Sequence, residues 1–358
     1  MESVGSQLTQ TGSSAEEGAG TQRDRLPFVD AAKGLAMICI ACGHFGFFAI
    51  DRVVFTFHVP LFYCLAGYFM SDRRDVTSFA RHKARTLLLP YYVIAFAIVL
   101  ATLPRAFASG DPAGFVLSKL GAVAYASGES YTTPFAIEKI GAPWFLWACF
   151  WGELFLRLSL GMHPAGRIAW VAGLLAFSQL TKDAIWLPLS IQAGAAATLF
   201  LYAGYLVRRG QDRLRALPPW AKALGLVGAL AVWAQFIWNF QSFWLVSADL
   251  GRGAIDVVGS LCACAVVLAG CHALQRSGLR LAGWLARFGR YTLLFLGIHS
   301  VELAAFPWGT AVRALEASSL AEPLQATILI AVRLMMDFAL LWLLLKSRTV
   351  CRVFGYQR

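Results

Sequence analysis

The chain has 358 residues, of which 58% are hydrophobic and 14% are charged. A water-soluble domain is nearer a quarter charged, and its core could not bury this share of apolar side chains, so a soluble globular fold is excluded. The formal net charge of +11 is divided among short basic clusters between apolar runs. That pattern indicates membrane topology and argues against nucleic acid as a partner.

Residues 1–22 are rich in Ser, Thr, Gly, Gln and Glu, without an apolar period, and are predicted to be a disordered tail. They lack the basic and apolar regions of a secretory signal. The segment 105–142 is too polar to span a membrane and is predicted to be an external loop, which could carry a surface helix. Ten apolar runs approach the ~20 residues that cross a hydrocarbon core: 28–50, 53–70, 87–104, 143–160, 168–181, 185–207, 219–239, 254–273, 288–306 and 324–345.

The sequence therefore predicts an all-α polytopic membrane protein of about ten transmembrane helices. Its membrane domain would occupy residues 23–346, and residues 347–358 would form a C-terminal tail. If the N-terminus lies inside, 23 of the 31 Lys and Arg residues fall on the inner side. Because basic residues concentrate in cytoplasmic loops, we expect both termini in the cytoplasm and a multi-pass protein of the inner or plasma membrane.

Ionisable residues at membrane depth are costly, so each is a candidate for function. In the first predicted span, Asp30, Lys33 and His44 are spaced three and eleven residues apart and would share one face of a continuous helix. His44 would lie ~16 Å beyond Lys33, and Asp30, at ~21 Å, would be too far to orient it. A non-catalytic alternative is that Asp30 and Lys33 mark the helix end and His44 bonds a nearby carbonyl.

The second predicted span begins near His58, with Pro60 in its first turn. A short turn joins the two spans, so His58 and His44 are expected to approach each other, although His58 could serve only as an interfacial cap. Other ionisable residues form pairs at helical spacing: Glu153 with Arg157, His299 with Glu302, and Arg333 with Asp337.

The spacing Cys39-x-x-Cys42, close to His44, resembles that of metal ligands. On a helix, however, the two cysteines would point roughly 140° and 200° away from His44, and a metal needs convergent ligands. No metal site is therefore expected. The basic segment 73–85, which includes Arg81, Lys83 and Arg85, could orient the protein, bind the phosphates of an anionic donor, or do both.

Several of these residues match family motifs. The run Arg25-x4-Asp30-x2-Lys33-Gly34, with ten residues between Lys33 and His44, resembles the opening motif of the acyltransferase-3 family of integral membrane acyltransferases. F-H-V-P-L-F at 57–62, followed by A-G-Y at 66–68, is similar to the family's F-H-x-P-L-F…S-G-Y signature, with Ala in place of Ser. Weaker matches in the expected order are R-T-L-L-L-P-Y at 85–91, P-W-F-L at 143–146, G-Y at 204–205, and G-R-Y-x3-F-x3-H at 289–299. The likeness covers residues 24–345.

This resemblance implies a ten-helix enzyme that transfers an acyl group, usually acetyl, to a hydroxyl of a cell-envelope or exported glycan. The most similar branch resembles the fucose 4-O-acetylases. Larger relatives carry a W-S-L-x-x-E motif, but here Cys149 stands in place of that Glu. Glu153 could substitute for it.

On this interpretation acetyl-CoA is the acyl donor, held by Lys33 and the basic segment, and no resident cofactor is expected. His44 would act as general base or carry the acetyl group. His58 would assist it, with His299 as a third candidate, while Asp30 would pair with Lys33 or Arg85. The expected partners are the acyl-CoA donor, a carbohydrate acceptor and membrane lipid, and homo-oligomerisation is left open. A polytopic transporter of a small molecule or glycan precursor is the alternative, although the sequence shows no inverted repeat.

Overall fold

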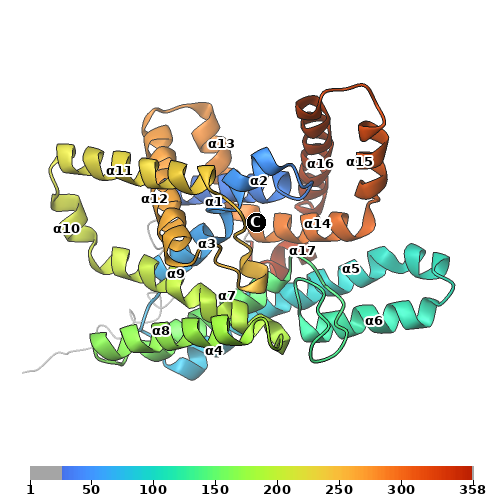
Figure 1. The fold of residues 1–358 in the computed structure, drawn as a ribbon, viewed down its shortest axis with the longest axis horizontal. Helices are drawn as coiled ribbons and strands as arrows, with labels where there is room; N and C mark the ends of the chain where they lie inside the picture. Colours follow the sequence, from blue (N-terminus) through green and yellow to red (C-terminus); the bar gives the residue numbers. More distant parts are fainter. Residues whose placement is uncertain (1–25, 357–358) are drawn as a thin grey trace, which may run out of the picture.

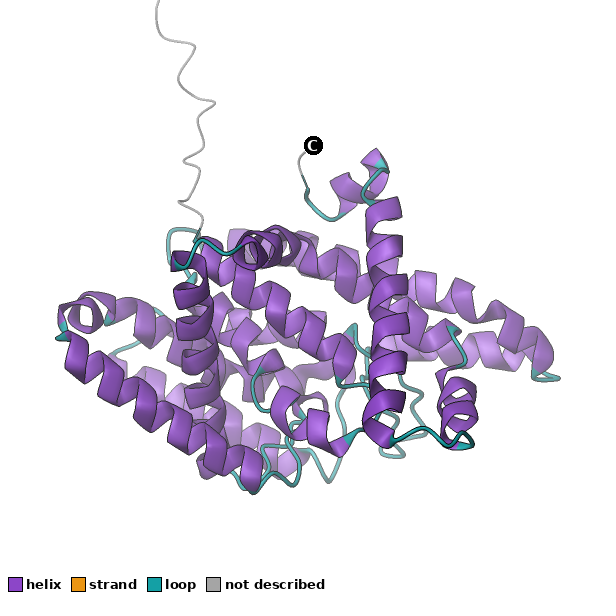
Figure 2. Ribbon diagram, turned by 90° about the horizontal axis from the view of Figure 1, so that it is seen from above, coloured by secondary structure: helices purple, strands orange, loops and turns teal. Residues whose placement is uncertain are grey.

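The computed structural model describes residues 26–356, so the predicted tail at 1–22 and Arg25 of the opening motif lie outside the described residues. The described chain consists of helices and loops, apart from one isolated β-bridge between Tyr131 and Ile137 (Figures 1 and 2). The prediction of an all-α protein is confirmed.

The N-terminal part of the membrane domain contains three helices, α1 (Pro27–Cys42), α2 (Phe48–Val54) and α3 (His58–Tyr68). The prediction that one helix runs from 28 to 50 is wrong, because α1 ends at Cys42 and is followed by Gly43 and Gly46. Gly46 has a φ of 78°, a conformation that glycine adopts without steric cost. His44 therefore lies in the turn after α1 and does not continue a helical stripe from Asp30 and Lys33.

The basic segment leads into a long helical arm. Helix α4 (Val76–Lys83) continues through a π-helical turn (Ala84–Leu88) into α5 (Leu89–Ala108), and α6 (Pro112–Tyr125) packs against α5. Single π-helical turns inside α-helices occur often at functional sites. The expected external segment 105–142 thus begins with the end of α5, contains α6, and continues as a loop.

The central helices are α7 (Trp144–Ser159), α8 (Pro164–Thr181), α9 (Ile191–Arg209), the short α10 (Gln211–Ala216), α11 (Pro219–Trp238) and α12 (Ala254–Arg276). Helix α9 packs against α3, α7 and α8. The α3–α9 crossing is very close: a Cβ at Gly67 would meet the backbone of Leu201, and one at Gly204 would meet the backbone of Cys64. Small residues at such crossings let helix backbones approach within a membrane.

The C-terminal part contains α13 (Arg280–Phe288), α14 (Thr292–Ala305), α15 (Trp308–Glu316), α16 (Glu322–Leu344) and α17 (Arg348–Val353). Gly289, between α13 and α14, lies against the backbone of Asp30 on α1, so α14 starts beside the start of α1. The expected C-terminal tail is partly helical, and the Tyr356 hydroxyl accepts a hydrogen bond from the backbone N–H of Leu294 at 3.2 Å.

Six helical segments of the described chain are long and apolar enough to cross a membrane, or seven if the bent α13–α15 unit counts as one span. Each predicted span overlaps a helix, but α1 and α7 have only 16 residues. The protein is therefore a polytopic membrane protein. The number ten and the cytoplasmic placement of both termini remain predictions.

Candidate active site

A cavity of about 930 Å³ lies between α1, α3, α5, α7 and α14. Helix α14 lines it from Thr292 to Ala304, so the cavity follows this helix over roughly 18 Å. Lys33 and Glu153 lie on its wall near the start of α14. A second charged region on the wall includes Arg105, which contacts the carbonyl oxygens at the end of α14, and the ion pairs Lys119–Glu138 and Lys139–Glu129. The cavity is large enough for a small-molecule substrate, and its walls are mostly apolar between these two charged regions.

His44 lines this cavity between the charged regions and is accessible from it. Its Nδ1 lies 2.7 Å from the carbonyl oxygen of Ile40. Because a carbonyl can only accept, Nδ1 carries the hydrogen and Nε2 keeps a free lone pair. The expected carbonyl contact is therefore present, and it leaves His44 able to act as a base or nucleophile.

His58 lines the same cavity from the first turn of α3. Its Nδ1 lies 2.6 Å from the carbonyl oxygen of Val54, so this imidazole also has Nε2 free. Both imidazoles contact the ring of Phe55, with centroids 6.4 Å away for His44 and 4.9 Å for His58. The structure thus brings the two predicted catalytic histidines to one site.

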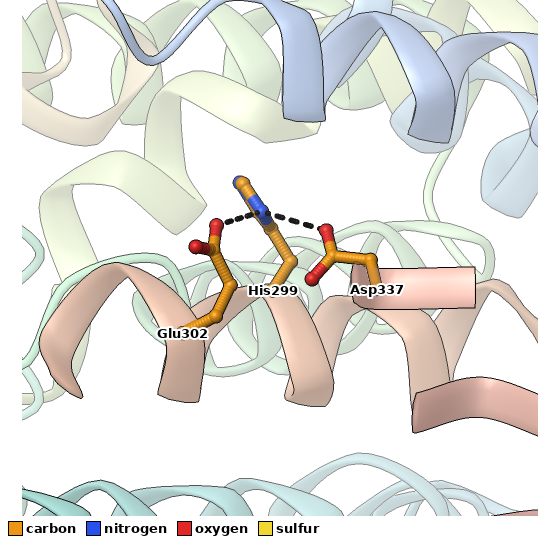
Figure 3. Close-up of side chains that lie close together, drawn as sticks. All are labelled: His299, Glu302 and Asp337. Atoms are coloured by element: carbon orange, nitrogen blue, oxygen red, sulfur yellow. Dashed lines mark ion pairs between the residues drawn. The ribbon is translucent and has the colours of Figure 1, made fainter. Parts of the chain in front are cut away.

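A third histidine adjoins His44 from the wall of α14. The rings of His299 and His44 lie edge to face with centroids 5.0 Å apart. His299 Nδ1 lies 2.9 Å from Glu302 Oε1 and 3.5 Å from Asp337 Oδ2 on α16 (Figure 3). His299, Glu302 and Asp337 are all buried, so their charges interact mainly with one another and little with bulk water.

Arg333 completes this cluster. Its Nε lies 3.0 Å from Glu302 Oε1, so its ion pair is with Glu302. The helical spacing had predicted a pair with Asp337, and that prediction is wrong. The residue is fully buried, and Trp308 donates a hydrogen bond to the same Glu302 carboxylate. Two pairs predicted on separate helices are in fact one cluster beside His44.

The Glu153 carboxylate, at the other charged region, forms an ion pair with Lys83. The predicted pairing with Arg157 is wrong, because Arg157 donates to the backbone oxygen of Arg74 at 2.6 Å and so anchors the basic segment to α7. The Glu153 side chain is 5% exposed and that of Lys83 is 25% exposed. A buried carboxylate therefore depends on a partner from the basic segment.

The family comparison now has its structural context. A family model described as an acyltransferase domain, the acyltransferase-3 model, matches residues 26–342. The chain belongs to the acyltransferase-3 family. The match includes every helix from α1 to α15 and nearly all of α16, and with the fold it shows a membrane acyltransferase. Comparisons with curated proteins and with solved structures return no match.

The basic segment of this acyltransferase forms a shallow hollow of about 410 Å³. Arg81 and Arg85 line it together with Arg73, Arg74 and His82. Of the three predicted donor-binding residues, Lys83 is the exception, because it is paired with Glu153 on the protein side of the segment. At the same end Lys33 Nζ lies 3.4 Å from Asp30 Oδ1, so Asp30 has Lys33 as its partner.

The donor atoms of His299, Glu302 and Asp337 lie within 4.8 Å of one another, the spacing of a group that could hold a metal ion. Arg333 already places a positive charge 3.0 Å from Glu302. Two carboxylates and one guanidinium leave a single negative charge, which one proton neutralises and a divalent ion would overcompensate. The charge balance favours a proton here, and the absence of a metal site stays a prediction.

Proposed function

We propose that this acyltransferase moves an acetyl group from acetyl-CoA to a hydroxyl of a cell-envelope or exported glycan. The observation that carries the proposal is the free Nε2 of His44 on the wall of a cavity with a charged region at each end. A base or nucleophile on this cavity wall, with its ring orientation fixed by the Ile40 carbonyl, suits acyl transfer.

The proposed donor is a polyanion, and two groups of cations could bind its phosphates. Arg81 and Arg85 line the basic hollow, and Lys33 lines the cavity at the end where Glu153 holds the basic segment. Arginine fits phosphate oxygens with paired hydrogen bonds. A donor bound by the hollow would direct its thioester along the cavity toward His44.

The chemistry at His44 has two forms that the geometry supports equally. As general base, Nε2 takes the proton of the acceptor hydroxyl while its oxygen attacks the thioester carbonyl, the C–S bond breaks, and the thiolate leaves and regains a proton. As nucleophile, Nε2 attacks the thioester carbonyl first, the C–S bond breaks and the CoA thiolate leaves. The acceptor oxygen then attacks the acetyl-imidazole and takes the acetyl group, the C–N bond breaks, and the proton of the acceptor hydroxyl goes to the departing Nε2 and from there to the thiolate. His58 would assist by relaying a proton or binding the acceptor.

The test uses the purified protein in lipid vesicles with radiolabelled acetyl-CoA and glycan stripped of its esters. Wild type should transfer label to the glycan, and His44→Ala should not. His163→Ala is the matched control, because His163 lies in the loop before α8, away from the cavity lining. Uptake of label into vesicles without any acceptor, unchanged in His44→Ala, would favour the transporter alternative and overturn the proposal.

A further inference from the structure

Four ionisable side chains lie buried together on α14 and α16: His299, Glu302, Arg333 and Asp337, here called the charged quartet. His299, Arg333 and Asp337 have 0% exposure and Glu302 has 5%. A buried ion cluster contributes little stability compared with apolar residues of the same size, and charges at membrane depth are costly. The quartet therefore calls for a functional explanation.

Arg333 connects the quartet to the turn that carries His44. Its Nη1 donates a hydrogen bond of 3.1 Å to the carbonyl oxygen of Ala41 at the end of α1. Its guanidinium also lies over the ring of Phe45, 3.6 Å from the centroid. A cation is favourable at the C-terminal end of a helix and over an aromatic face. Arg333 thus holds the chain on both sides of His44.

His299 makes the second connection. Its Nδ1 faces the carboxylates of Glu302 and Asp337, which fixes the ring against the edge of His44. The groups facing His44 are then the Ile40 carbonyl from α1, Phe55 and His58 from α2–α3, and His299 from α14, with Arg333 from α16 behind the turn. Helices α14 and α16 supply two carboxylates, Glu302 and Asp337, which contact the His299 ring that lies against His44.

The net charge of the quartet determines how strongly it affects proton binding by His44. Glu302 and Asp337 carry two negative charges and Arg333 carries one positive charge, so the quartet is neutral when it holds one proton. In a low-dielectric site, adding or removing one charge at this range changes proton binding by a neighbouring imidazole. The quartet is thus poised so that neither strong positive nor strong negative potential acts on Nε2.

We propose that the charged quartet is a positioning network, which holds the turn containing His44 and balances the charge beside it so that Nε2 is unprotonated and aimed into the cavity. The proposal rests on the proposed role of His44. These four residues act through His44 and do not themselves contact the substrate.

The test compares Asp337→Asn and Arg333→Gln, which change the charge of the quartet in opposite directions. Asn removes a negative charge, so His44 should lose its proton more readily and the acid limb of the kcat–pH profile should move to lower pH. Gln removes a positive charge, so that limb should move to higher pH. We expect shifts of about one pH unit each, with kcat about 10-fold to 100-fold lower and the KM for acetyl-CoA unchanged.

Two further variants keep the result interpretable. Arg333→Lys retains the charge but loses the fork that reaches Ala41 and Glu302, so kcat should fall without a shift of the acid limb. Arg313→Gln on α15 is the control and should behave as wild type, because its guanidinium donates to the hydroxyl of Thr310, one turn away on the same exposed helix. Size-exclusion profiles and thermal unfolding in detergent check that each variant is folded.

The proposal is overturned if Asp337→Asn and Arg333→Gln move the acid limb in the same direction or not at all. A folded pair of variants with wild-type kcat would also overturn it. These outcomes are separable from failure of the proposed function, because that is decided by His44→Ala. Activity lost in His44→Ala, with no opposite shifts in the quartet variants, would leave the role of His44 standing and remove the network.

Discussion

A methyl group at Gly204 should force α3 and α9 apart. The added Cβ would lie 2.7 Å from the carbonyl carbon of Cys64 and 3.0 Å from its Cα, as well as against the carbonyl oxygen. Non-bonded carbon atoms prefer about 3.5–4.0 Å, so the two helices would have to separate by roughly 1 Å. Overpacking of this kind typically costs about 1–3 kcal/mol. Helix α3 carries His58 in its first turn, so the same movement would displace His58 from His44.

Gly204→Ala should therefore lower the unfolding temperature in detergent by several degrees and reduce acyl transfer at a temperature where the protein is still folded. Gly225→Ala on α11 is the matched control, because its added methyl group would have no described atom within 4 Å beyond its own helical backbone. Alanine is the better helix former by roughly 1 kcal/mol, so the control should be neutral or more stable. If Gly204→Ala equals Gly225→Ala in stability and activity, the close crossing of α3 and α9 is refuted.

Three other changes test the packing and the donor site. Lys83→Met leaves the buried Glu153 carboxylate without its partner and should cost about 2–3 kcal/mol in detergent unfolding, whereas Lys83→Met combined with Glu153→Met should restore most of that loss; no difference between the single and double variants would contradict the ion pair. The double variant Arg81→Gln, Arg85→Gln should raise the KM for acetyl-CoA several-fold at low salt and by less at high salt, while kcat is retained. An unchanged KM would exclude the basic hollow as the phosphate site. Arg105→Met removes hydrogen bonds to three carbonyl oxygens at the end of α14 and should lower stability by about 2 kcal/mol; an unchanged unfolding temperature would show that water replaces this cap.

Hydropathy alone was enough to predict the membrane class, and each predicted apolar run overlaps a helix, because the apolar runs reflect the lipid solvent directly. It could not predict the break after Cys42. The argument from helical phase extended α1 to His44, although Gly43 and Gly46 mark a turn in the sequence. The prediction that His44 and His58 approach each other did not depend on that phase, because the short connection between their helices limits their separation.

Helical spacing predicted one pair of charged residues correctly and two pairs wrongly. His299 and Glu302 are neighbours, as their spacing indicates. Glu153 and Arg333, in contrast, form ion pairs with Lys83 and Glu302, and not with the residues four positions away on their own helices. Spacing along one helix says which residues share a face, but it does not say which helix packs against that face. The charged quartet depends on the packing of α14 against α16, so the sequence could not predict that its four residues form one cluster.

The central claim is that His44 performs acyl transfer from the cavity wall. The most direct measurement is ester-linked acetate on surface glycans from a deletion strain complemented with wild type, His44→Ala or His163→Ala, with membrane levels of each protein matched. We predict acetate in the wild-type and His163→Ala strains and none in the deletion and His44→Ala strains. Acetate at the wild-type level in the His44→Ala strain would contradict the account.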